Sequence, residues 1–115
     1  RAKVVESAIL MEQGIAISAC PPDSGYSPLI AAQAADELIS IKGIQASFVL
    51  AEREGAISIS GRSLGEINVQ LIMERLGGGG HLNVAGAQLT DCTVEEAKQK
   101  IQNTLDEMLE EGDIE

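Results

Sequence analysis

Two kinds of hydrophobic periodicity alternate along this 115-residue chain, and they restrict its fold more than any other feature does. Five short segments are rich in apolar and β-branched residues or alternate between apolar and polar ones, which is typical of strands. We therefore expect strands over 4–11, 14–20, 45–53, 56–61 and 85–89. Turn residues join the first strand to the second and the third to the fourth, and the latter pair is expected to form a hairpin.

Helix patterns and helix end signals lie between and after these strands. Ser27 followed by proline is an N-cap followed by the residue favoured at the first helical position, so a helix is expected over 28–42, ended by Gly43. The capping box Thr-x-x-Glu over 93–96 predicts a long helix to about Glu111. The buried stripe of that helix is expected to consist of Ala97, Ile101, Leu105 and Met108.

A third, shorter helix is expected just before a run of glycines. Apolar residues recur with helical spacing from Val69 to Leu76, which makes Asn68 the N-cap. Ser63 and Glu66 form a competing capping box a few residues earlier. The apolar period favours Asn68.

The resulting order, ββαββαβα, predicts an α/β fold of the α+β, mixed-sheet kind, with roughly five strands in one mixed sheet flanked by about three helices. No repeat or linker divides the chain, so residues 1–115 are expected to form one domain. Because the sequence has one Tyr, one Phe and no Trp, its core must be built from Ile, Leu, Val and Ala.

The charge balance limits the partners of the chain. Its formal net charge is −10, whereas non-specific nucleic-acid binding requires a basic face. Residues 91–115 hold nine acids and two lysines, and residues 1–90 hold nine acids and six bases. Most of the excess negative charge therefore belongs to the last helix, where it is expected to form a solvated face. A long polyanion is therefore disfavoured as a ligand, and two aromatic residues are too few for a base-stacking platform.

The start of the chain indicates a piece of a longer protein or a processed one, and its cysteines favour a reducing, cytosolic environment. The chain begins with Arg1 instead of Met, and the sequence shows neither a signal peptide nor an apolar run long enough to span a membrane. Cys20 and Cys92 have no metal-ligand spacing, so two reduced thiols are expected.

Four consecutive glycines, Gly77, Gly78, Gly79 and Gly80, followed by His81, are the least ordinary feature of the sequence. Ordering each glycine costs about 1 kcal/mol of additional backbone entropy, so the run needs an explanation. One explanation is an anion site, in which successive bare amide groups form a concave nest and the histidine adds a donor at its edge. The other is a plain turn. The spacing alone leaves both open.

Arg62 is the second candidate for binding an anion. Strand alternation puts Ser58, Ser60 and Arg62 on one face. A guanidinium at a strand end can bind a phosphate with two hydrogen bonds. It can equally pair with a surface carboxylate such as Glu66, and the sequence does not decide between these roles.

Several chemistries are excluded. Leu82 stands where the dinucleotide-binding fingerprint needs its third glycine, and no Lys-Ser/Thr pair follows the glycines as a phosphate-binding loop requires. His81 is the only histidine and the aspartates are scattered singly, so a multi-histidine or two-metal centre is not expected. We therefore assign no catalytic residue and no metal ligand to this chain.

The glycine run and its surroundings resemble the C-terminal DHH-associated domain of the DHH-family phosphoesterases. The Gly-rich motif that ends in His, followed by Ala-Gly and preceded by Arg-Ser and a short helix, carries the resemblance. It covers nearly the whole chain and is greatest to the membrane-anchored cyclic-di-AMP phosphodiesterases of bacteria. The segments that support this are 26–28, 34–38, 46–50, 61–63, 68–69 and 77–87.

The resemblance implies a division of labour between two domains. An N-terminal DHH domain would hold two Mn²⁺ ions and activate the attacking water, while this domain closes over the substrate. Carried over to this sequence, residues 77–80 would supply backbone donors, His81 would contact phosphate or base, and Arg62 with Ser63 would clamp phosphate. The chain alone is then expected to bind weakly and to hydrolyse nothing.

The resemblance also implies partners and a location. The ligand would be a small cyclic or short linear dinucleotide, and the DHH domain of the same polypeptide would be the main protein partner, with a homodimer compatible. The chain would be a cytoplasmic domain of a bacterial membrane protein, with transmembrane helices, a PAS domain and a degenerate GGDEF domain ahead of the DHH domain. No contact with the membrane or with a long nucleic acid is expected for this segment.

Three alternatives remain. One is a nanoRNA, oligonucleotide or phosphoadenosine phosphatase of the same superfamily. Another is a tRNA-binding module like the C-terminal one of alanyl-tRNA synthetase, against which His81 and the charge of −10 both count. The third is a purely structural domain in which the glycines form a tight turn.

Overall fold

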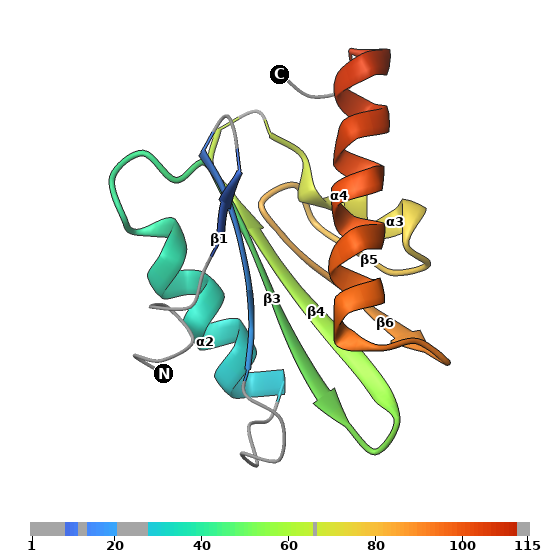
Figure 1. Ribbon diagram of the computed structural model, residues 1–115. Helices are drawn as coiled ribbons and strands as arrows, with labels where there is room; N and C mark the ends of the chain where they lie inside the picture. The colour runs from blue at the N-terminus through green and yellow to red at the C-terminus, as the bar shows by residue number, and fades with distance from the viewer. Residues whose placement is uncertain (1–8, 12–13, 21–27, 66, 113–115) are drawn as a thin grey trace.

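Six strands form one mixed sheet with helices on both faces (Figure 1). The computed structural model describes residues 9–11, 14–20, 28–65 and 67–112. The strand order is β1-β2-β3-β4-β6-β5, and β2 and β3 are parallel while the other neighbouring pairs are antiparallel. The elements in chain order are β1 (Ile9–Met11), β2 (Ile15–Ala19), α2 (Pro28–Ile39), β3 (Ala46–Arg53), β4 (Ala56–Ser63), α3 (Val69–Arg75), β5 (Gly79–Gly80), β6 (Val84–Thr90) and α4 (Val94–Glu111).

This architecture confirms the predicted fold class and the predicted order of the longer elements. The two-residue strand β5 is an addition, because it forms inside the glycine run and the five predicted strands do not include it. The predicted hairpin joins β3 to β4 through Glu54 and Gly55, whose φ angles of 55° and 81° are both positive, as the tight hairpin turns of twisted strands require.

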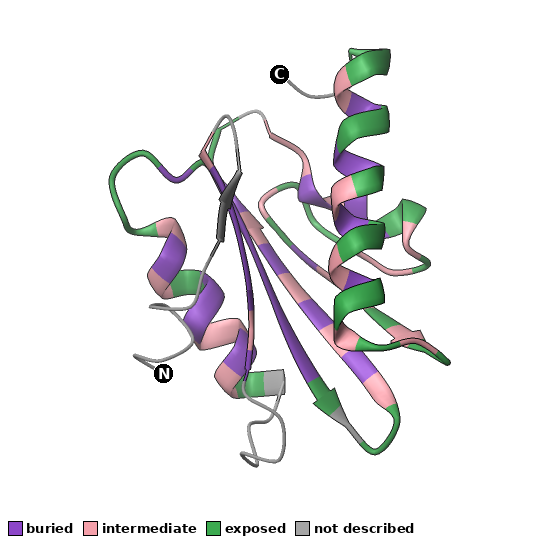
Figure 2. Cartoon of the chain, viewed as in Figure 1, coloured by how far each residue is buried: buried purple, intermediate pink, exposed green. Residues whose placement is uncertain are grey.

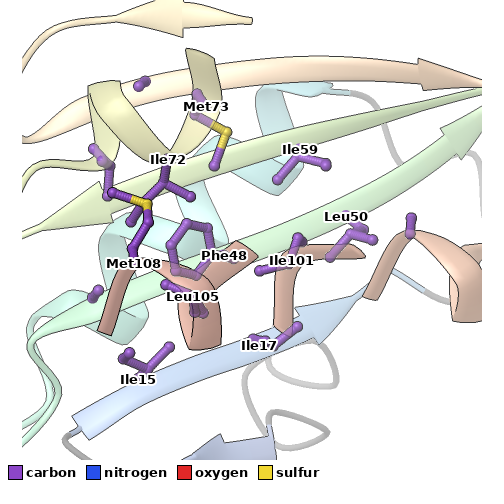
Figure 3. Close-up of a cluster of buried hydrophobic side chains, with 14 of the residues drawn as sticks. Ile15, Ile17, Phe48, Leu50, Ile59, Ile72, Met73, Ile101, Leu105 and Met108 are labelled. Carbon is purple, nitrogen blue, oxygen red and sulfur yellow. The ribbon is translucent and has the colours of Figure 1, made fainter. Parts of the chain in front are cut away.

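Two cores lie on the two faces of the sheet. On one face, α3 and α4 pack on the central strands around Phe48, and Figure 3 shows this ring among Ile72, Leu105 and other buried side chains. The predicted stripe of α4 is buried there, with Ala97, Ile101 and Met108 at 0% exposure and Leu105 at 1%. On the other face, α2 packs on β3 and β4. Figure 2 shows bands of buried and exposed residues along both α2 and α4.

Small residues let α2 lie close to the sheet. Ala31, Ala34 and Ala35 have no exposed surface. The hydroxyl of Ser47, on β3, donates a 2.8 Å hydrogen bond to the carbonyl of Ala35. This bond fixes the middle of α2 over the end of β3 at which Ser47 lies.

The predicted helix starts are confirmed where the structure describes them. The side chain of Asn68 accepts a hydrogen bond from the amide of Leu71, so Asn68 is the N-cap of α3, as the apolar period indicated. The capping box of Thr93 and Glu96 is complete in both directions. Ser27 and residues 4–8 lie outside the described residues.

Two predicted boundaries were wrong. Helix α2 ends at Ile39 and not near residue 42, because the amides of Ser40 and Ile41 bond to carbonyls three residues back and the hydroxyl of Ser40 donates to the carbonyl of Glu37. Strand β4 continues beyond residue 61 to Ser63, since Arg62 and Ser63 still pair with Ser47 and Ala46 of β3.

The two cysteines are free thiols, as predicted. Cys20 is buried beside α2, whereas Cys92 is partly buried. Burial raises the pKa of the Cys20 thiol, so this side chain is held in its neutral, unreactive form.

Candidate functional site

Arg62 lies on the α2 face of the sheet, near the end of β4. Its side chain is only 15% exposed although it carries a full charge. The Nε group donates a 2.7 Å hydrogen bond to Oδ1 of Asp36 on α2, and Nη1 donates at 2.9 Å to the carbonyl of Gly61. The predicted pairing with a carboxylate therefore occurs, with Asp36 as the partner, whereas Glu66 lies outside the described residues.

Ser63 is buried, and its hydroxyl takes part in a hydrogen-bond network with Ile67 and Asn83. It is 4% exposed, and its hydroxyl donates to the carbonyl of Ile67 at 2.6 Å. The same oxygen accepts a 3.0 Å hydrogen bond from Nδ2 of Asn83, which also donates to the carbonyls of Gly65 and Ile67. Strand alternation puts Ser63 on the face opposite Arg62, so the two predicted phosphate ligands are not brought together.

Replacing Ser63 with alanine tests this structural role. We expect Ser63→Ala to lower the free energy of unfolding by about 1–3 kcal/mol, because the carbonyl of Ile67 and the amide of Asn83 lose a buried partner. Urea denaturation would measure the change. The matched control is Ser40→Ala, which removes an exposed hydroxyl that also bonds to a backbone carbonyl and should change stability by less than about 0.5 kcal/mol. Equal effects of the two substitutions would contradict the buried network.

Two of the four amide groups of the glycine run are not free to act as donors in a nest. The amides of Gly77 and Gly78 donate to the carbonyls of Glu74 and Met73, so they cap the end of α3. The amide of His81 donates at 2.8 Å to the carbonyl of Val84. The run is thus a helix end followed by a short edge strand, and its backbone is largely used by the fold.

Three of the four glycines are required by the fold itself. Gly77 has a φ of 89°, which disfavours any other residue. A Cβ atom at Gly78 would lie 2.1 Å from the carbonyl oxygen of Gly86, and one at Gly80 would lie 2.5 Å from the Cα of Ala85. At Gly79 a Cβ atom would meet nothing within 4 Å, and the φ angle lies outside the left-handed region. The described residues therefore give no reason for a glycine at position 79.

His81 and Arg62 belong to the same row of the sheet. Arg62 pairs with Val84, and Val84 exchanges two backbone hydrogen bonds with His81, of 2.8 and 3.3 Å. His81 therefore stands one strand spacing beyond Val84, and its side chain is exposed. The next row on the same face, two residues along β4, joins Ser60 to Gly86 and Gly79. The fold thus places Arg62, His81 and the bare backbone of Gly79 on one face of the sheet, with β6 between β4 and the edge strand β5.

This edge of the α2 face is open and carries little net charge. Arg62 and Ser60 are partly buried beside α2, while Val84 is 49% exposed. Asp36 balances the charge of Arg62. The acidic helix α4 packs on the opposite face, so the sheet separates most of the negative charge from this site (Figure 1). A small anion can approach this edge without meeting α4.

Asp36 and Asn83 are the site residues that the sequence analysis missed. Asp36 is separated from Arg62 by 26 positions and Asn83 from Ser63 by 20, so no local pattern joins either pair. Asp36 stood out only as an acidic residue in an alanine-rich helix and as part of the segment 34–38 that supports the resemblance, and neither signal gave it a role in the site.

The described residues show neither a cluster of metal-ligating side chains nor a membrane-spanning helix. Among those residues, no three His, Cys, Asp or Glu side chains group closely enough to hold a metal ion. None of the described helices is both long and apolar enough to cross a membrane.

Comparison with protein families and with individual proteins gives a consistent result. Residues 12–111 match the model of the DHHA1 domain family. The chain is 48% identical over 113 residues to the cyclic-di-AMP phosphodiesterase GdpP of Geobacillus thermodenitrificans, covering 97% of this chain and 17% of that protein. It is 49% identical over 107 residues to the cyclic-di-AMP phosphodiesterase PdeA of Listeria monocytogenes, covering 92% of this chain and 16% of that protein. The chain thus spans less than a fifth of the length of these relatives.

The fold is also found in a solved structure. An exopolyphosphatase-related protein from Bacteroides fragilis superposes with a TM-score of 0.82 at 24% identity, over 93% of this chain and 33% of that one. At this identity the likeness shows the fold alone.

Proposed function

Because the chain belongs to the DHHA1 domain family, we propose that it is the substrate-binding domain of a DHH-family phosphodiesterase that hydrolyses cyclic-di-AMP to a linear dinucleotide. The names of the relatives from Geobacillus and Listeria support this substrate. The observation that carries the proposal is the row that joins Arg62, Val84 and His81 at the open edge of the sheet.

Each residue of this edge would make a different contact with a bound phosphodiester. Arg62 would donate two parallel hydrogen bonds to phosphate oxygens, as guanidinium groups do. His81 would donate to a second oxygen or contact the base, and its exposed position leaves it accessible. Gly79 would let the ligand approach the backbone closely, because no side chain stands there. Gly77, Gly78 and Ser63 would act indirectly, by fixing the loops around the site.

The rest of the activity is assigned to other parts of a longer polypeptide. Two Mn²⁺ ions held by a DHH domain would supply the activated water, and this domain would close over the substrate. We also propose that such a polypeptide is a membrane-anchored bacterial signalling protein with this domain on the cytoplasmic side. A homodimer is compatible with these assignments.

Substitution of Arg62 and His81 in the full-length protein tests the proposal. We expect Arg62→Ala to lower kcat/KM for cyclic-di-AMP about 10- to 100-fold, since each charge-assisted hydrogen bond contributes about 1.5–3 kcal/mol. His81→Ala is expected to lower it about 10-fold. Both variants should keep the melting temperature within a few degrees, because His81 is exposed and Arg62 bonds to a single side chain, that of Asp36, among the described residues.

Arg75→Ala is the matched control, because this arginine also forms an ion pair but lies on α3, packed toward the other face. It should leave kcat/KM unchanged. Wild-type turnover in both site variants would overturn the proposal. Faster hydrolysis of short linear oligonucleotides or phosphoadenosine than of cyclic-di-AMP would favour the oligonucleotide or phosphoadenosine phosphatase instead.

A further inference from the structure

The guanidinium of Arg62 is held at two of its three nitrogens. Of its five N–H groups, the Nε group bonds to Asp36 and one on Nη1 bonds to the carbonyl of Gly61. Within the described part of the chain, the remaining N–H groups of Nη1 and Nη2 have no partner. They include both N–H groups of Nη2, so Arg62 keeps donors for the oxygens of a phosphate.

Asp36 is itself fixed in place. It follows Ala35, which is fully buried and whose carbonyl accepts the hydrogen bond from Ser47. Ser47 is the register partner of Arg62 on β3. The sheet therefore anchors α2 at the same row from which Arg62 projects, and the carboxylate of Asp36 meets the Nε group from a rigid support.

We propose that Asp36 is the positioning residue for Arg62, and that it orients the guanidinium so that Nη2 is presented to a phosphate of the ligand. The proposal rests on the proposed function, because it takes Arg62 as the phosphate-binding residue. A free arginine side chain loses much rotamer freedom when it binds. Here the ion pair with Asp36 has already removed that freedom before the ligand arrives.

The carboxylate has a second, opposing effect. Its negative charge would lie close to a phosphate bound by Arg62 and would repel it, so removing the charge alone should strengthen binding. Losing the orientation of Arg62 should therefore raise KM, whereas losing the repulsion should lower it. The two effects can be separated, because asparagine keeps the oxygen that accepts from Nε and removes only the charge.

The experiment compares Asp36→Ala and Asp36→Asn in the full-length protein, with KM and kcat for cyclic-di-AMP measured separately. We expect Asp36→Ala to raise KM about 3- to 10-fold and Asp36→Asn to leave it unchanged or lower it. In an Arg62→Lys background, which lacks the planar fork, Asp36→Ala should change KM less than 2-fold. Asp36 is 62% exposed, so both variants should fold, and melting temperatures would verify this.

Glu111→Ala is the control, since it breaks a 2.6 Å ion pair with Arg75 on α3 and should leave KM unchanged. A KM that is unchanged or lower in Asp36→Ala, while Arg62→Ala still loses activity, would overturn the positioning role alone. An equal rise of KM in Asp36→Asn and Asp36→Ala would also overturn it. No effect of Arg62→Ala would instead overturn the proposed function.

Discussion

Replacing Gly78 with alanine is expected to lower the free energy of unfolding by about 3 kcal/mol. The added Cβ atom would lie 2.1 Å from the carbonyl oxygen of Gly86 and 2.6 Å from the Cα of Ala87. Both atoms belong to the backbone of β6, which pairs with β4 and cannot move away cheaply. The substitution would therefore separate β5 from β6 or shift the end of α3, whose Met73 carbonyl accepts from the amide of Gly78 at 2.7 Å.

Gly79→Ala is the matched control for this prediction, at the next position of the same run. Its Cβ atom would meet nothing within 4 Å, so its stability should stay within about 0.5–1 kcal/mol of the wild type, and an increase is allowed because alanine restricts the unfolded chain. Chemical denaturation of the two variants would measure the difference. Equal stabilities would show that the glycine run is a loose loop and not a closely packed helix end.

Replacing Phe48 with alanine is expected to lower the free energy of unfolding by about 3–5 kcal/mol. Phe48 is fully buried in the centre of the larger core and is the only phenylalanine in the chain. Figure 3 shows its ring between the sheet and the side chains of α3 and α4. Gly61 lies beside this ring, and a Cβ atom there would lie 3.4 Å from Cδ1 of Phe48 and 3.0 Å from Cε of Met73. Since whole domains are stable by about 5–15 kcal/mol, this loss would unfold a measurable fraction of the protein.

Phe48→Leu is the control, which keeps most of the apolar volume and should cost about 1–2 kcal/mol. Thermal and urea denaturation of both variants would give the two values. A cost below about 1 kcal/mol for Phe48→Ala would contradict the packed core, because so small a loss requires that the cavity collapses without resistance.

Much of the fold could be predicted because its signals are local. The N-cap of α3 and the capping box of α4 each involve residues three positions apart, and the stripe from Ala97 to Met108 repeats within one helix. Such patterns reflect the secondary structure that a segment favours independently of its tertiary contacts. The misplaced end of α2 shows the limit, since the hydroxyl of Ser40 competes for a carbonyl of the last turn and ends the helix early.

The candidate site could be predicted only in part. The family resemblance implied that Arg62 and Ser63 clamp a phosphate together. Strand alternation instead puts their side chains on opposite faces, and the buried Ser63 hydroxyl is bonded to Asn83. The nest of glycine amides, one of the two alternatives that the sequence left open, loses two of its donors for a related reason. The end of α3 needs donors for its last carbonyls, and the amides of Gly77 and Gly78 are the nearest.

The sequence by itself determined the element types, their order, the helix caps and the residue kinds available for binding an anion. These depend on periodicity and on contacts within a few residues. Only the tertiary structure decided which residues meet: it paired Arg62 with Asp36, placed His81 in the same row, and left Gly79 as the one glycine of the run that the fold does not require. The physical reason is that strand register and the docking of α2 are set by packing between segments far apart in the chain, and no local pattern carries that information.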